Sequence, residues 1–236
     1  MELWPTSEAA LEARQAELAS LAPPPWAPPT IPTIGGVWFA APTGSTGEAP
    51  GEPAWAAAVS LREGAIVGEF VVRGRTGAGY HAGHMALREG PLLQLAVEAL
   101  PSAPDVLLVN ATGRDHPRRA GLALHLGAVL DLPTIGVTDR PLLATGPEPS
   151  AERWASTELE LDGAVVAARV RTRLGARAVV VHPGWRTDLP VAIDLVRRVD
   201  GPARTPEPLR TARRAARLAR AHDEEARPSG SPMWTS

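Results

Sequence analysis

Residues 106–121 read Val-Leu-Leu-Val-Asn-Ala-Thr-Gly-Arg-Asp-His-Pro-Arg-Arg-Ala-Gly. The continuous apolar run at residues 106–109 predicts a strand that is buried on both faces, as strands of parallel sheets are. A polar loop follows, and Pro117 can open a helix that runs to Leu130 because proline is well tolerated in a first helical turn. The stretch therefore predicts a central strand, a loop and a helix of an α/β protein.

Hydrophobic periodicity and turn residues predict the other elements. We expect helices at residues 7–21, 85–100 and 189–199 and an arginine-rich helix after Pro206, and strands at 33–40, 55–60, 65–72, 105–110, 134–137, within 159–173 and at 178–181. Three consecutive antiparallel strands followed by alternating strands and helices predict an α/β fold with a mixed sheet covered by helices on both faces.

Length and composition agree with one domain. A chain of 236 residues that is 44% hydrophobic and 21% charged can bury a sizeable core. We expect a single domain over residues 1–222, with an N-terminal helix and a proline-rich connector at 23–29, and a disordered tail at 223–236. The absence of cysteine excludes disulfides and thiolate metal ligands. No signal peptide or apolar run of about 20 residues is recognisable, so we expect a cytoplasmic protein without a membrane segment.

The charge pattern is unusual because every one of the 24 basic residues is arginine. The formal net charge of −2 argues against a wholly basic surface, so any phosphate contact must come from local clusters of guanidinium groups. One such cluster lies on one face of the last predicted helix and comprises Arg210, Arg213, Arg214, Arg217 and Arg220, with Ala212, Ala216 and Ala219 on the opposite face. This stripe predicts either a solvated helix face or a phosphate-binding surface.

Several short sequence motifs resemble those of the endonuclease V family, which nicks DNA or RNA beside deaminated bases such as inosine. They are Arg88-Glu89-Gly90-Pro91, the loop at 110–121, Leu132-Pro-Thr-Ile-Gly-Val137 and Pro206-Glu-Pro-Leu-Arg210, and the resemblance extends over nearly the whole chain. It implies a ribonuclease H-like fold. It also implies a Mg²⁺ cofactor, held by carboxylates at neighbouring strand ends, that activates a water for phosphodiester hydrolysis.

The resemblance implies three acidic metal ligands, of which this chain keeps one. Glu89 matches the family's glutamate, whereas Gly36 in Ile34-Gly-Gly-Val-Trp-Phe39 stands where an aspartate belongs and Asn110 replaces the aspartate that ends the central strand. An amide oxygen is a neutral ligand, and Mg²⁺ prefers ionised oxygens. We therefore expect Glu89 and Asn110 to form a weak metal site and cleavage to be lost or strongly reduced.

Two nearby acids offer an alternative, because displaced carboxylates from Asp115 and Asp139 could rebuild a metal site. His116 matches the family's catalytic histidine, so Glu89 and His116 are the candidate catalytic residues. Asp139 stands where the family has a lysine, and Trp185 stands where it has a second histidine. For Glu89 the competing interpretation is a solvated acid near a helix start. For His116 it is an ordinary loop histidine.

The nucleic-acid-binding residues implied by the resemblance are Tyr80, Gly83, Gly113, Arg118, Arg119 and Gly121. Tyr80 could stack on a base, the glycines could let backbone approach a flipped base, and the two arginines, near a helix start, could bind phosphate. Plain packing and turn roles are the competing interpretations of the tyrosine and the glycines.

Three functions remain open from the sequence. The first is a monomeric protein that recognises inosine-containing or distorted DNA or RNA with little or no cleavage. The second is an active Mg²⁺-dependent nuclease with rearranged ligands. The third is a protein-interaction module on the same fold, because a fold does not guarantee the chemistry once hosted on it.

Overall fold

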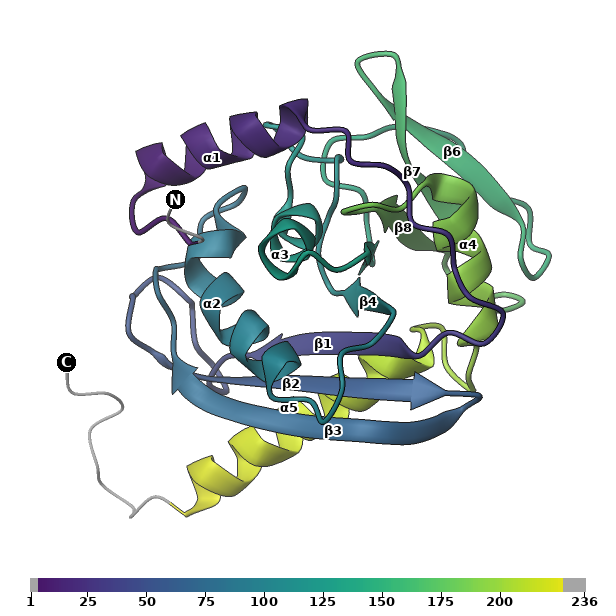
Figure 1. The fold of residues 1–236 in the computed structure, drawn as a ribbon. Helices are drawn as coiled ribbons and strands as arrows, with labels where there is room; N and C mark the ends of the chain where they lie inside the picture. The colour runs from purple at the N-terminus through teal and green to yellow at the C-terminus, as the bar shows by residue number, and fades with distance from the viewer. Residues whose placement is uncertain (1–3, 227–236) are drawn as a thin grey trace.

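One mixed sheet of eight strands organises this computed structural model, which describes residues 4–226 (Figure 1). The strands are β1 (Ile34–Ala40), β2 (Pro53–Arg62), β3 (Ala65–Arg75), β4 (Val106–Val109), β5 (Thr134–Thr138), β6 (Ser156–Leu161), β7 (Ala164–Val170) and β8 (Val179–Pro183). The helices are α1 (Glu8–Ser20), α2 (Met85–Glu98), α3 (Leu122–Leu130), α4 (Leu189–Arg198) and α5 (Glu207–Glu225). The predicted α/β class is confirmed.

The strand order is β3-β2-β1-β4-β5-β8-β7-β6. Strands β1, β4 and β5 run parallel in the centre, while β2 and β3 on one side and β8, β7 and β6 on the other are antiparallel to their neighbours. This is the mixed, ribonuclease H-like arrangement that the order of predicted elements indicated. The carboxyl ends of β1, β4 and β5 therefore lie at one edge, and the loops that follow β4 and β5 meet there.

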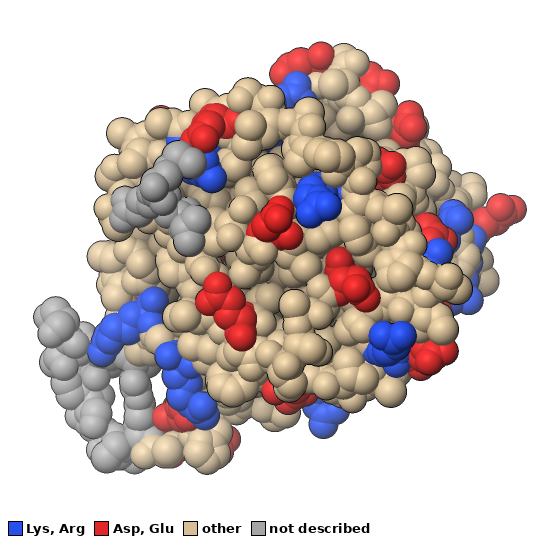
Figure 2. Space-filling model, viewed as in Figure 1, with Lys and Arg blue, Asp and Glu red and all other residues tan. Residues whose placement is uncertain are grey.

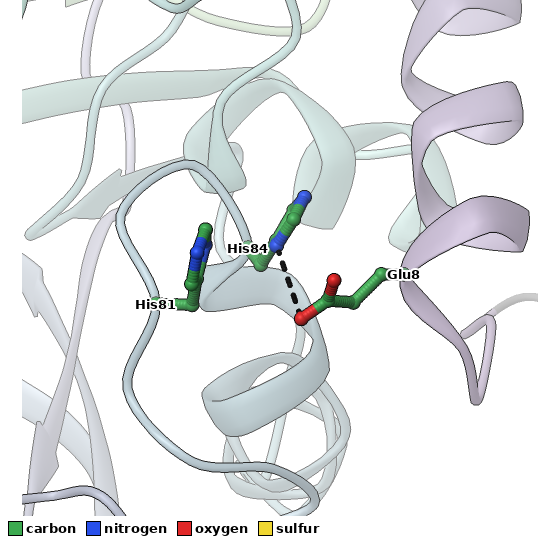
Figure 3. Close-up of side chains that lie close together, drawn as sticks. All are labelled: Glu8, His81 and His84. Atoms are coloured by element: carbon green, nitrogen blue, oxygen red, sulfur yellow. Dashed lines mark ion pairs between the residues drawn. The ribbon is translucent and has the colours of Figure 1, made fainter.

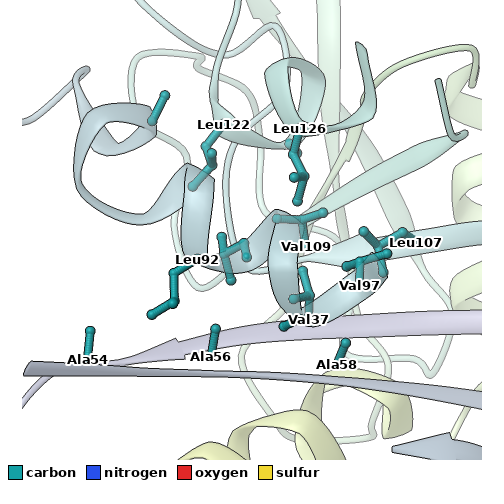
Figure 4. Close-up of a cluster of buried hydrophobic side chains, with 14 of the residues drawn as sticks. Val37, Ala54, Ala56, Ala58, Leu92, Val97, Leu107, Val109, Leu122 and Leu126 are labelled. Carbon is teal, nitrogen blue, oxygen red and sulfur yellow. The ribbon is translucent and has the colours of Figure 1, made fainter. Parts of the chain in front are cut away.

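Helices cover both faces of the sheet, as predicted. On one face α2 and α3 pack on β1, β2 and β4, and Figure 4 shows the buried side chains of this layer, among them Val37, Leu92, Val109 and Leu126. On the other face α4 and α5 pack through Leu195 and Leu209 onto a second core. Because side chains alternate along a strand, neighbouring residues of β1 belong to different cores.

The segment between β4 and α3 differs from the prediction of a helix beginning at Pro117. The helix begins at Leu122, residues 117–118 form a turn, and residues 119–121 have no regular structure. The reason is local backbone geometry: Arg119 adopts a left-handed φ of 55°, and Gly121 donates its N–H to the Gly113 carbonyl at 2.8 Å. These bonds fold the loop back on the strand end instead of extending the helix.

Two other boundaries differ from the sequence-based expectation. The apolar stretch at 159–173 divides into β6 and β7 around Asp162 and Gly163, whose positive φ values of 49° and 76° make a tight hairpin turn. Helix α5 continues to Glu225, so residues 223–225 of the predicted tail are helical, and residues 227–236 lie outside the described part of the chain. Among the described residues, no helix combines the length and apolar character that crossing a bilayer requires.

Candidate functional site

A pocket of about 170 Å³ opens where the loops after β4 and β5 meet the start of α2. That volume is more than ten times the about 10–15 Å³ that a single water requires. The pocket is lined by Gln15, Tyr80, Ala82, Gly83, Met85, Ala86, Glu89, Asn110, Ala111, Thr112, His116, Leu122, Thr138 and Leu142. The structure thus brings together five of the predicted site residues, namely Tyr80, Gly83, Glu89, Asn110 and His116.

Glu89 is the single acidic side chain on the pocket wall within residues 4–226. Helix α2 carries it, and burial raises the pKa of Glu89 to about 8, while the neighbouring Arg88 partly opposes the shift. Arg88 itself is buried and bonded to Glu52 at 2.9 Å and to the Gly47 carbonyl at 2.9 Å. Arg88 therefore holds the chain before β2 against α2 and compensates Glu89 only weakly.

Asn110 is exposed at the end of β4 and supplies the amide oxygen that the sequence predicted for this position. The assignment of Gly36 to the same site is corrected by the structure. A Cβ at Gly36 would lie 2.4 Å from the backbone of Pro208 at the start of α5, on the opposite face of the sheet. The pocket-side residues of β1 are Val37 and Phe39, which pack with α2, so the strand still contributes no acid to the pocket face.

Neither alternative acid reaches the pocket. Asp115 is fully buried, and its carboxylate accepts the backbone N–H groups of Leu142, Leu143 and Ala144 at 2.7–2.8 Å. Asp139 pairs with Arg204 on the surface. Asp115 thus serves as an anchor for the loop after β5. Neither carboxylate lines the pocket in this structure, and a metal site rebuilt from them stays a prediction.

The pocket therefore offers a divalent cation one carboxylate, one amide oxygen and the hydroxyls of Thr112 and Thr138. Mg²⁺ sites in proteins rely on ionised oxygens at near-octahedral positions. Glu89 is also the kind of acid that burial keeps protonated near neutral pH, which removes its charge unless a cation displaces the proton. This donor set fits Mg²⁺ poorly.

His116 lies in the pocket, but both its ring nitrogens are occupied. Nε2 donates to the Gly83 carbonyl at 3.1 Å, and Nδ1 accepts the Arg118 N–H at 3.2 Å. Burial lowers the pKa of His116 to about 4, so the ring is neutral near pH 7. In this arrangement His116 holds a loop in place, and its predicted catalytic role stays a prediction.

Gly83 is a junction between α1, the loop after β4 and the loop before α2. Its φ of 84° favours glycine, and its carbonyl accepts hydrogen bonds from Gln15 at 3.2 Å, His116 at 3.1 Å and Arg118 at 3.1 Å. These bonds position the segment that carries Tyr80. Tyr80 lines the pocket yet is 60% exposed, which leaves its ring free to meet a planar group from solution.

The other predicted binding residues contact the protein itself. Arg118 donates to Gln15 at 2.6 Å, and Arg119 pairs with Asp162 at 2.9 Å in the β6–β7 turn. A Cβ at Gly113 would lie 2.2 Å from the Pro183 carbonyl oxygen, and one at Gly121 would lie 2.4 Å from the Thr112 carbonyl oxygen. Both glycines make room for neighbouring backbone, as the competing interpretation of a packing role expects.

His182 is a residue that the sequence reasoning did not single out for the site. It is fully buried on β8, and its Nε2 donates at 2.9 Å to the hydroxyl of Thr138 on the pocket wall. Burial lowers the pKa of His182 to about 4. By contrast, Trp185 packs beside α3 and donates to Asp131, outside the pocket lining. The sequence of β8 and of the two residues that follow it contains no signal that distinguishes these two environments.

The arginine stripe of α5 lies behind the sheet. Ala212 and Ala216 are buried against β1 and β2, and Arg214 and Arg217 are exposed. Since α5 packs on the face opposite α2, its arginines do not border the pocket. Figure 2 shows acidic and basic side chains interspersed over the face in view, in keeping with the small net charge.

Comparison with known proteins identifies the scaffold. The Endonuclease V family model matches residues 21–214, which is most of the chain. The chain belongs to the endonuclease V family. Endonuclease V of Methanopyrus kandleri is 44% identical over 147 residues, which cover 62% of this chain and 63% of that protein. The match thus spans less than two thirds of this relative's length.

Solved structures agree with this endonuclease V assignment. Endonuclease V from Streptomyces avermitilis superimposes with a TM-score of 0.84 at 32% identity, covering 94% of this chain and 96% of that one. Endonuclease V from Ciona intestinalis, solved in complex with DNA containing an inosine followed by a ribo-adenosine, has a TM-score of 0.78 at 20% identity, covering 91% and 97%. The ribonuclease H-like fold is therefore that of endonuclease V proteins, including one solved with inosine-containing DNA.

Proposed function

We propose that this endonuclease V-family protein binds inosine-containing or distorted nucleic acid and cleaves it weakly or not at all. The single observation that carries the proposal is the pocket beside α2, which keeps Tyr80 at its mouth and has Glu89 as its one acid within residues 4–226. The ligand class comes from the Ciona intestinalis relative, whose structure contains inosine-bearing DNA. DNA and RNA are both candidates.

Binding is supported by the shape and composition of the pocket. Its wall is mostly apolar, with Ala86, Met85 and Leu122, and it also offers the amide of Asn110 and the hydroxyl of Thr112. Enzymes that act on nucleobases hold a flipped base by stacking and by hydrogen bonds to its edge. Exposed Tyr80 supplies an aromatic face for stacking on a neighbouring base.

Weak cleavage is supported by the shortage of negatively charged side chains on the pocket wall. Phosphodiester hydrolysis assisted by metal ions requires cations held firmly at the scissile phosphate. Here β1 presents Val37 and Phe39 to the α2 face, Asn110 is neutral, and Asp115 is committed to backbone N–H groups. Glu89 alone would have to retain the cation.

The test measures binding and cleavage on the same strands. Fluorescence anisotropy compares labelled DNA and RNA strands that carry one inosine with matched strands that carry adenosine. Denaturing gels then follow cleavage with Mg²⁺ or Mn²⁺. We expect the inosine strand to bind more tightly, and we expect no more product from the wild-type protein than from Glu89→Gln.

Two outcomes would contradict the proposal in different ways. Multiple-turnover cleavage that Glu89→Gln abolishes would establish an active nuclease with rearranged ligands. Equal or undetectable binding of both strands would favour a protein-interaction module. The variant Asn110→Asp provides a matched gain-of-charge control, since a second carboxylate on the pocket wall should strengthen Mn²⁺ binding.

A further inference from the structure

A cluster of two histidines and a glutamate lies outside the pocket, between α1 and the loop that precedes α2. Glu8 belongs to the first turn of α1, and His81 and His84 belong to the loop (Figure 3). One ligand atom from each residue lies within 4.8 Å of those of the other two. Among residues 4–226 this is the one group of three or more histidine or acidic side chains with metal-binding spacing.

The hydrogen bonds of His84 leave one nitrogen available. Nε2 lies 3.0 Å from a carboxylate oxygen of Glu12, and because a carboxylate only accepts, this nitrogen carries the proton. Nδ1 is buried, makes no hydrogen bond within the described residues, and lies 3.6 Å from Glu8 Oε1. A carboxylate behind a histidine is the usual outer partner of a metal-bound imidazole, since it sets the tautomer and orients the ring.

His81 has a comparable arrangement. Its Nδ1 donates to the Ala82 carbonyl at 3.1 Å, which leaves Nε2 as the lone-pair nitrogen. The two imidazole rings stack with centroids 4.6 Å apart. Arg118 binds Glu12 at 3.1 Å and balances its charge, whereas Glu8 is the carboxylate that faces the unprotonated Nδ1 of His84.

We propose that Glu8, His81 and His84 bind a transition-metal ion of the Zn²⁺ class. Two neutral imidazoles and one carboxylate suit Zn²⁺ or Ni²⁺, whereas Mg²⁺ prefers an all-oxygen shell. Ligand atoms lie about 2.0–2.2 Å from Zn²⁺, so the three groups must approach each other slightly. The buried His84 is fixed, and the exposed Glu8 and His81 are free to make that movement.

The ion would clamp α1 to the loop that ends at His84. That loop includes Tyr80 and Gly83, both on the pocket wall. The metal would therefore limit the motion of the pocket's aromatic residue without touching the pocket acid Glu89. The proposed site is independent of the proposed function, because it requires neither nucleic acid nor cleavage.

The test titrates the full-length, tag-free protein with Zn²⁺ in competition with a chromophoric chelator. We expect one Zn²⁺ per chain, and an affinity at least about 10-fold lower in Glu8→Gln and in His81→Ala, since even outer partners of a metal contribute about 10- to 100-fold. Both replaced side chains are exposed, so the variants should fold. His222→Ala, which removes an exposed histidine on α5, should bind Zn²⁺ like the wild-type protein.

Hydrogen exchange tests the clamp separately. Zn²⁺ should slow amide exchange at residues 79–84 in the wild-type protein and not in His81→Ala. Absence of binding at about 100 µM Zn²⁺, a concentration far above the dissociation constants of structural zinc sites, would overturn the site. Wild-type Zn²⁺ affinity in both Glu8→Gln and His81→Ala would overturn the site as well. If Zn²⁺ binds but amide exchange at residues 79–84 is unchanged, the clamp is overturned.

Discussion

Glu89 illustrates at the scale of one residue how burial changes the chemistry of a side chain. The unperturbed pKa of 4.5 rises to about 8 because the folded protein surrounds the carboxyl group with weakly polar material. The folded state therefore binds a proton that the unfolded state releases. The stabilising contribution is fully present below pH 4.5 and is lost as the pH rises to about 8.

Replacing Glu89 by glutamine should remove this pH dependence. In EDTA, we expect the stability of Glu89→Gln relative to wild type to improve between pH 5 and pH 8.5 by a few kcal/mol at most, because one pKa unit corresponds to about 1.4 kcal/mol. Urea unfolding followed by tryptophan fluorescence gives the free energies. Glu98→Gln, an exposed acid on the same helix, is the control. Parallel pH profiles for wild type and Glu89→Gln would refute the shift.

Helix α5 ends with a contact to the sheet that lies beyond the predicted domain boundary at residue 222. Its last turn is attached to the sheet by Asp223, which accepts hydrogen bonds from Arg73 at 2.7 Å and Trp55 at 2.8 Å. The hydrogen bond from Arg73, followed by that from Trp55, lowers the pKa of Asp223 to about 2. The sequence-based prediction placed a tail from residue 223, whereas this contact lies within the helix, which continues to Glu225.

Asp223→Asn should weaken this attachment. We expect a loss of about 1–2 kcal/mol of unfolding free energy at pH 7, the lower end of the about 1.5–3 kcal/mol for hydrogen bonds to charged groups, because Arg73 is exposed and solvent screens the pair. The folded pKa lies below the unfolded value of 3.8, so the contribution is present above pH 3.8 and declines as the pH falls towards 2. Thermal and urea unfolding measure the change, with exposed Glu225→Gln as the matched variant. Equal losses in both variants would mean that the contact is not specific.

In the whole molecule the sheet separates the pocket from the arginine stripe of α5, although the sequence alone does not show that they lie on different faces. The pocket with Tyr80 lies beside α2, and the exposed Arg214 and Arg217 lie on α5 behind the sheet. The pocket and the arginine stripe are therefore two separate candidate surfaces, and mutations can distinguish them.

Tyr80→Ala should lower the affinity for an inosine-containing strand by about 5- to 150-fold, which corresponds to about 1–3 kcal/mol for base stacking. The double variant Arg214→Ala/Arg217→Ala should change the affinity by less than about twofold at 0.15 M salt, where the Debye length is about 8 Å. Anisotropy titrations measure both. A large loss in the arginine variant with none in Tyr80→Ala would move the binding surface to α5.

Much of the fold could be predicted because strands and helices arise from patterns over a few residues. The buried run at 106–109 predicted β4, and the apolar periodicity of 85–100 predicted α2. The short motifs that resemble endonuclease V correctly predicted the family. The predicted helix start at Pro117 was wrong, because the backbone hydrogen bond from Gly121 to Gly113 folds that loop back on itself. The structure places Glu89 and Asn110 on one pocket wall, and the weak metal site expected from them stays a prediction.

The sequence by itself determined the family, the order of the elements and the shortage of acids around Glu89. Only the tertiary structure decided that Gly36 faces α5, that the Asp115 carboxylate accepts backbone N–H groups, and that Glu8 lies beside His84. A shift of one residue along a strand turns a side chain to the other face of the sheet. Ligand convergence depends on packing between segments far apart in the chain, and local patterns carry no information about such distances.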